Sequence, residues 1–253
     1  MRVNRLSKKA GKKNKGKIFF GLLIAVSALA LILLFLLNAS FFLIQDAAIS
    51  GNDIVSDEDI KSRIGLSDGN DVNIFSFSQK KALSKLFENA YIKTAQIKKN
   101  FPNGLEITIT ERAGKCYVEY ENMGMFLLID ETGMVLDVKT YMNEKLPVIS
   151  GLSFDTFVVG KYLDTDDRDS FSNAILVYRI FEKYGVDLTK LDISDKNNIR
   201  IYVGGVDVSF GSTDDADEKV RTLKAILEKL TPGIKGFLDI SDVSRDPVFR
   251  YLR

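Results

Sequence analysis

The side chains that most often do chemistry in proteins are unevenly represented in this sequence. It contains no histidine and one cysteine, Cys116. Without histidine, a Ser-His-Asp triad, a Cys-His pair and a histidine-ligated zinc site are excluded. Cys116 stands in a run of alternating apolar residues, which predicts a small core residue rather than a nucleophile. A single cysteine also excludes an intramolecular disulfide.

Carboxylates are the remaining candidates for catalysis, because a glycoside hydrolase needs two of them about 5–10 Å apart and no histidine. The acidic cluster that starts at Asp164 does not match a helix-loop-helix calcium loop. That loop needs Gly at its sixth and Glu at its twelfth position, where Asp169 and Ile175 stand. Helix starts and turns account for most of the other acidic residues. The sequence therefore predicts no catalytic residue, no metal and no cofactor, and a membrane-anchored wall hydrolase remains the alternative.

An uncharged apolar segment of twenty residues runs from Ile18 to Leu37. A helix of about 20 apolar residues spans the roughly 30 Å hydrocarbon core of a bilayer. Residues 1–17 carry eight Lys and Arg and no acidic residue, and such positive flanks stay in the cytoplasm. We therefore expect a basic cytoplasmic tail over 1–17, a transmembrane helix over 18–40 and extracytoplasmic domains beyond it. A cleaved signal is the alternative, but its apolar region is shorter, about 7–15 residues.

The charge of the remaining chain limits its partners. Eight of the 35 basic residues precede the apolar segment, so residues 46–253 hold 27 basic against 34 acidic residues, a net charge of −7. This mildly acidic composition argues against a nucleic-acid partner. No GxGxxG and no Walker motif occurs, and no small-molecule substrate is expected. The basic tail is interpreted as a determinant of orientation that contacts anionic lipid.

Residues 41–112 have the pattern of a small β-α-α-β-β domain. Ser56 with Asp59, and Ser76 with Gln79, have the spacing of helix N-caps. The Phe-Pro-Asn-Gly turn at 101–104 precedes a strand in which apolar and polar residues alternate.

Residues 113–253 are rich in predicted strands and contain two predicted helices, so the fold class is α+β. One helix covers 168–184 and ends at Gly185, and a second follows Ser212 and Asp215. The last strand is predicted over Gly236–Val243, with a short tail after it. Two hairpins are also predicted, one joining 116–120 to 126–129 and one turning at Gly204-Gly205.

The order of these parts, together with several motifs, resembles the bacterial cell-division protein family FtsQ/DivIB. Gly114 departs from the family pattern, which has Pro there, and Ser241 and Asp242 stand where better-known relatives have an aromatic residue. The motifs that carry the resemblance are Ile49–Asn52, Tyr91–Lys99, Phe101–Arg112, Leu128–Leu136, Leu146–Leu152 and Leu238-Asp239-Ile240.

The resemblance implies a POTRA domain over 41–112, a module that binds other polypeptides, and a β domain over 113–253. It implies a non-enzymatic scaffold of the division machinery, anchored by one membrane pass and concentrated at the septum. Its expected partners are the FtsL-like and DivIC/FtsB-like bitopic proteins, through which it helps to regulate septal peptidoglycan synthesis. A POTRA-bearing secretion component is a further alternative.

Binding is expected by strand addition, because a strand that ends a sheet leaves backbone N–H and C=O groups unpaired. The predicted last strand is the candidate. In the alternative interpretation, Leu238 and Ile240 belong to the core, and Phe249 and Tyr251 cover the edge. The candidate partner-binding residues are Phe237, Leu238, Asp239, Ile240, Phe249 and Tyr251.

Overall fold

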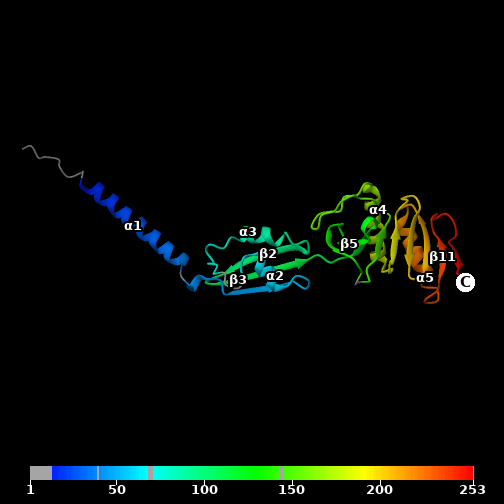
Figure 1. Ribbon diagram of the computed structural model, residues 1–253, viewed down its shortest axis with the longest axis horizontal. Helices are drawn as coiled ribbons and strands as arrows, with labels where there is room; N and C mark the ends of the chain where they lie inside the picture. The colour runs from blue at the N-terminus through cyan, green and yellow to red at the C-terminus, as the bar shows by residue number, and fades with distance from the viewer. Residues whose placement is uncertain (1–12, 39, 68–70, 143–144, 253) are drawn as a thin grey trace, which may run out of the picture. The chain divides into compact units, whose positions relative to one another are not determined.

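The computed structural model describes residues 13–38, 40–67, 71–142 and 145–252. Within them the chain forms two compact units (Figure 1). The first runs up to residue 86 and includes 95–109, and the second contains 87–94 and all residues from 110 onward. Most of the predicted basic tail, residues 1–12, lies outside the described residues.

Helix α1 (Lys13–Asn38) contains the apolar segment. Its 26 residues correspond to a length of about 39 Å, more than the hydrocarbon core of a bilayer. The window Gly16–Phe35 has a mean hydropathy of 3.0, and none of it is buried against the protein. Among the described residues this is the one helix with the length and composition to cross a membrane.

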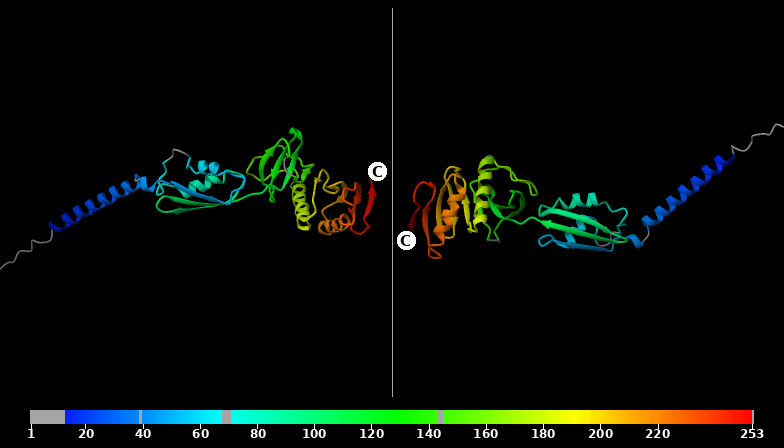
Figure 2. Two further views of the ribbon diagram at one scale, coloured as in Figure 1. Left: turned by 90° about the horizontal axis from the view of Figure 1, so that it is seen from below. Right: turned by 180° about the vertical axis from the view of Figure 1, so that it is seen from behind.

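The first unit contains a three-stranded sheet in the order β1-β3-β2, in which β1 pairs in parallel with β3. Two helices lie against one face of this sheet (Figure 2). The alternating residues Leu105, Ile107 and Ile109 of β3 are buried, as are Ile60 and Leu86 of the helices. The predicted β-α-α-β-β order is thus confirmed. The elements are η1 (Ser40–Phe42), β1 (Asp46–Ser50), α2 (Asp57–Arg63), α3 (Gln79–Leu86), β2 (Ile92–Asn100) and β3 (Gly104–Glu111).

The N-cap of α2 agrees with the sequence, whereas that of α3 does not. The Ser56 side chain accepts a hydrogen bond from the Asp59 N–H, 3.2 Å away. In α3 the acceptor is Ser78, to which the Lys81 N–H donates, so the prediction of Ser76 was wrong. The Ser76 hydroxyl donates instead to the backbone carbonyl of Asn73, and the helix begins two residues later than predicted.

The second unit contains a nine-stranded mixed sheet in the order β12-β11-β10-β9-β8-β7-β4-β5-β6. Both predicted hairpins are confirmed, since β4 pairs antiparallel with β5 and β9 with β10. Strand β8 was not predicted. The strands are β4 (Cys116–Tyr120), β5 (Met125–Ile129), β6 (Val135–Lys139), β7 (Val148–Ser150), β8 (Lys190–Asp192), β9 (Ile199–Val203), β10 (Val206–Gly211), β11 (Gly236–Asp239) and β12 (Val248–Tyr251).

Two helices, α4 (Arg168–Tyr184) and α5 (Ala216–Leu227), belong to this unit. Helix α4 has the predicted length and ends at Gly185, whose φ of +63° is the left-handed conformation that glycine adopts easily. The predicted cap of α5 was wrong in detail. Asp215 is its N-cap residue but makes no side-chain capping bond, and the Ser212 hydroxyl donates to Asp214.

The main core of the second unit lies between one face of the sheet and these helices. Cys116 and Val118 of β4 belong to it, together with Phe181 of α4 and Val220 of α5. The thiol of Cys116 is fully buried, and burial raises its pKa because the thiolate would lose its hydration. The predicted structural role of this cysteine agrees with its position.

Candidate functional site

The predicted binding residues lie on β11 and β12, at one end of the nine-stranded sheet. The two strands are antiparallel, with Gly236 opposite Tyr251 and Leu238 opposite Phe249. The expectation that the strand beginning at Gly236 ends the sheet was wrong, because β12 continues the sheet beyond it. A loop after β11 reverses the chain, and the segment after Pro247, predicted as a tail, adds the terminal strand.

The structure separates the six candidate residues into three groups. The side chains of Leu238 and Ile240 are buried in the core. Phe237 and Phe249 are half-buried. Asp239 and Tyr251 are exposed, and 67% of Tyr251 is accessible.

Phe249 connects the core to the exposed end of β12. Its ring crosses Gly236, where a Cβ atom would overlap it. The ring also contacts that of Tyr251 edge-on, with 4.9 Å between the centroids. Aromatic rings that contact in this way hold each other in place. The exposed Tyr251 ring is therefore held by Phe249, which itself packs on the core.

The outer side of β12 presents backbone groups to solvent in the described part of the chain. The Leu252 N–H donates to the Lys235 carbonyl at 3.1 Å, which fixes the alternation of hydrogen-bonded pairs along the two strands. By this alternation, Phe249 and Tyr251 direct their N–H and C=O groups away from β11. Val248 and Leu252 add exposed apolar side chains. This edge has the properties that strand addition requires.

A buried lysine binds the loop that precedes α5. Lys219 of α5 is only 3% exposed, and its Nζ donates to the Ser212 carbonyl at 2.9 Å. The same Nζ lies 5.2 Å from the centroid of the Phe210 ring. Burial lowers the pKa of Lys219, since the ammonium group loses hydration there. Sequence reasoning missed this residue, because a lysine on an amphipathic helix is ordinarily expected to face solvent.

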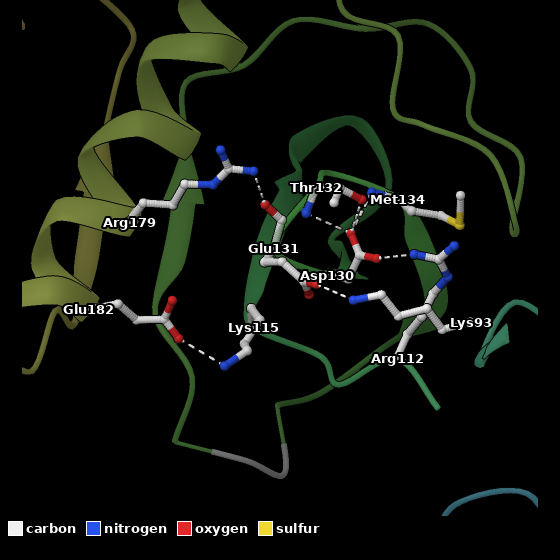
Figure 3. Close-up of polar contacts among 9 residues, drawn as sticks. All are labelled: Lys93, Arg112, Lys115, Asp130, Glu131, Thr132, Met134, Arg179 and Glu182. Carbon is white, nitrogen blue, oxygen red and sulfur yellow. Dashed lines mark hydrogen bonds and ion pairs between the residues drawn. The ribbon is translucent and has the colours of Figure 1, made fainter. Parts of the chain in front are cut away.

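A second group of polar side chains surrounds the turn between β5 and β6 (Figure 3). Asp130 is fully buried, and its carboxylate accepts hydrogen bonds from Arg112 at 2.7 Å and from the Thr132 hydroxyl at 2.6 Å. The backbone N–H groups of Thr132 and Met134 also donate to it. Burial alone would raise the pKa of Asp130, but these hydrogen bonds outweigh burial and lower it.

The neighbouring carboxylates are paired as well. Glu131 accepts a hydrogen bond from Lys93 at 2.9 Å, and its backbone carbonyl accepts one from Arg179 of α4 (Figure 3). Glu182 accepts one from Lys115 at 2.8 Å. These bonds lower the pKa values of Glu131 and Glu182. A glycosidase needs one carboxyl group whose pKa is raised, so that it stays protonated. Hydrogen bonding in this cluster has the opposite effect.

The cluster around Asp130 and the β12 edge consequently suit different tasks. The cluster around Asp130 is a set of ion pairs and hydrogen bonds that fixes a turn, which is a structural role. At the β12 edge, unpaired backbone groups and exposed aromatic surface occur together. Sequence reasoning found Phe249 and Tyr251 but missed Val248 as part of a strand. The signal was present as Val-Phe-Arg-Tyr directly after Pro247, in which Val248, Phe249 and Tyr251 favour a strand.

Comparison with known proteins agrees with this architecture. Residues 42–112 match the model of the family described as POTRA domain, FtsQ-type. The chain is 29% identical to Cell division protein DivIB of Clostridium botulinum (strain Hall) over 250 residues. This aligned region covers 94% of this chain and 93% of that protein.

Two further relatives have lower sequence identity to the chain. Cell division protein DivIB of Bacillus subtilis (strain 168) is 25% identical over 231 residues, covering 90% of this chain and 82% of the relative. Cell division protein FtsQ of Syntrophotalea carbinolica is 24% identical over 229 residues, covering 88% and 78%. The family model over residues 42–112, together with these relatives, which extend over both units, supports membership of the chain in the FtsQ/DivIB family of bacterial cell-division proteins.

Proposed function

We propose that this protein is a non-enzymatic scaffold of the division machinery that captures its partners by strand addition to β12. The observation that carries the proposal is that β12 ends the nine-stranded sheet of the described chain with one side unpaired. A partner segment would form main-chain hydrogen bonds along this side. The exposed Tyr251 and the half-buried Phe249 would provide side-chain specificity.

In this proposal the six candidate residues have different tasks. Tyr251 and Phe249 contact the partner. Leu238 and Ile240 lie in the core and support β12 from within, and the exposed Asp239 stands at the end of β11, where the loop to β12 begins. Tyrosine and other aromatic residues dominate the energetics of many interfaces, since a large ring is fixed at little entropic cost.

The proposed partners are the FtsL-like and DivIC/FtsB-like bitopic proteins, which also span the membrane once. Support comes from the names of the relatives, which are cell-division proteins, and from α1, which has the length of a membrane span. Confinement to one membrane raises the effective concentration of such partners near β12. Through this complex the protein is proposed to help regulate septal peptidoglycan synthesis.

The proposed topology has the amino terminus in the cytoplasm and both units outside. Its support is the excess of Lys and Arg before the apolar segment. Protease added to intact spheroplasts is expected to digest both units. A fluorescent fusion is expected to form a ring at midcell, and a uniform membrane signal would contradict septal concentration.

A substitution in the full-length chain tests the β12 edge. Tyr251→Lys places a charge on the exposed edge and is expected to abolish capture of the co-expressed FtsL-like and DivIC-like partners in a pull-down. The matched control is Tyr141→Lys, because Tyr141 is 68% exposed, close to the 67% of Tyr251, but lies away from β12. Equal capture by both variants would refute the proposed site.

The wall-hydrolase alternative has its own test. The purified full-length protein is incubated with peptidoglycan, and the soluble fraction is analysed for sugar fragments. The proposal expects none above a heat-denatured control. Release of fragments that disappears in the Glu182→Gln and Asp130→Asn variants would overturn the non-enzymatic assignment.

A further inference from the structure

Four phenylalanine rings form a continuous row in the first unit. The ring centroids of Phe41 and Phe42 are 5.2 Å apart, those of Phe42 and Phe75 are 5.0 Å apart, and those of Phe75 and Phe101 are 5.4 Å apart. The four residues come from three segments that are distant in sequence. We call this set the phenylalanine row.

Backbone hydrogen bonds hold these three segments together. The Ile74 N–H donates to the Phe42 carbonyl at 2.9 Å, which joins the loop before α3 to η1. The Gln45 N–H donates to the Asn103 carbonyl at 3.1 Å, which joins the β2–β3 turn to the start of β1. The phenylalanine row is therefore a fixed feature of one end of the three-stranded sheet.

Three of the four rings are open to solvent. Phe41 is 67% exposed, Phe101 is 61% exposed and Phe75 is 45% exposed. Phenylalanine is among the residues most often buried in soluble proteins, and contiguous exposed apolar patches mark binding surfaces. An ordered row of exposed rings without a function would lower the solubility of the domain.

The position of the row along the chain indicates what covers it. Helix α1 ends at Asn38, and Phe41 is three residues further on, a span of at most about 10 Å. The headgroup region on each side of a bilayer is about 5–8 Å thick. If α1 spans the membrane, Phe41 is held at the membrane surface, and the ring contacts hold Phe75 and Phe101 close to it.

We propose that the phenylalanine row inserts into the interfacial region of the bilayer from which α1 emerges. The rings are thus covered by lipid of the membrane that α1 spans. Aromatic rings favour this region, where the acyl chains meet the headgroups. The inference depends on membrane insertion of α1, but it is independent of β12 and of the partners proposed above.

The absence of tryptophan from the sequence provides a direct test, since a single introduced tryptophan is the only one that fluoresces. Phe101→Trp in the full-length protein replaces one exposed aromatic residue by another. The protein is reconstituted into phosphatidylcholine vesicles whose lipids carry bromine near the headgroup end of the acyl chain. Bromine quenches tryptophan only at short range.

Two variants of the same chain serve as controls. Tyr162→Trp is the matched negative control, because Tyr162 is 62% exposed, close to the 61% of Phe101, but belongs to the second unit. Phe35→Trp lies within the apolar window of α1 and reports whether the helix is inserted.

The expected result is a blue-shifted emission of Phe101→Trp and a loss of its intensity in brominated vesicles, with Tyr162→Trp unchanged. Quenching of Phe35→Trp without quenching of Phe101→Trp would overturn the inference, and would assign the row to a protein contact while leaving the membrane span intact. If neither Phe35→Trp nor Phe101→Trp is quenched, α1 is not inserted and the inference also fails.

Discussion

Arg112 and Asp130 form an ion pair with 2.7 Å between Nη1 and Oδ2, and the side chain of Asp130 is completely buried while that of Arg112 is 16% exposed. Arg112 directly follows β3, and Asp130 lies in the turn after β5. Taking charges out of water is costly, so each partner depends on the other to offset that cost.

Removal of the Arg112 cation is expected to destabilise the protein more than removal of an exposed cation. Arg112→Met leaves the buried Asp130 carboxylate without its charged partner, and it should lower the free energy of unfolding of the second unit by about 3 kcal/mol. Chemical denaturation in detergent, followed by circular dichroism, measures the loss. Arg245→Met is the control, because its pair with Asp242 is exposed and should contribute less than about 1 kcal/mol. Equal losses would show that Asp130 does not need Arg112.

The pH dependence of stability should contain a contribution from Asp130. Its pKa in the folded protein is lowered from 3.8, so the unfolded chain binds the proton more readily. The stabilisation is therefore complete above pH 3.8 and is lost as the pH falls through the folded-state pKa. Unfolding midpoints measured from about pH 6 to about pH 2 should fall less steeply at the acidic end in Asp130→Asn. An unchanged profile would contradict this assignment.

Gly236 is expected to be essential for the placement of the aromatic residues on β12. A Cβ atom there would overlap the ring of Phe249 and lie 2.7 Å from the Arg250 carbonyl oxygen. Gly236→Ala should therefore displace β12, cost about 1–3 kcal/mol and weaken partner capture. The double variant with Phe249→Leu removes the overlapping ring but not the contact with the Arg250 carbonyl, so it should recover part of the stability but not capture. Additive losses in the double variant would contradict the proposed overlap.

The N-cap of α2 should make a measurable contribution to the first unit. Ser56→Ala removes the acceptor for the Asp59 N–H and should cost about 1 kcal/mol, whereas Ser56→Asp keeps an acceptor and should cost much less. Hydrogen exchange at the Asp59 amide is the sharpest measurement. Exchange that is equally fast in both variants would show that the side chain at position 56 does not protect this amide.

Local signals explain why so much of the fold could be predicted. The Gly204-Gly205 turn, the cap at Ser56 and the end of α4 at Gly185 each depend on residues only a few positions apart. Strand β8 could not be predicted, since its three residues join β7 in parallel and β9 antiparallel, and those pairings follow from the tertiary fold. Strand β12 was missed because it has four residues and only one paired side.

The candidate site could be predicted only in part, because some of its features are local in sequence and others depend on the tertiary fold. Phe249 and Tyr251 could be singled out as aromatic residues after the predicted last strand, but which of them faces the core depends on pairing with β11. The ion pair of Arg112 with Asp130 joins residues 18 positions apart on different elements. No periodicity in a single segment contains that information. The phenylalanine row is equally invisible in sequence, because its members come from three separate segments.

The complete burial of Cys116 has a practical consequence. Its sulfur lies inside the core and is fully buried, so a maleimide added to the folded protein has no thiolate to attack. Since the chain has no other cysteine, one introduced at Tyr251 or Phe101 would be labelled alone. Spin labels, dyes and cross-linkers can therefore be attached singly to the natural sequence, and distances between its modules become measurable without prior removal of a native thiol.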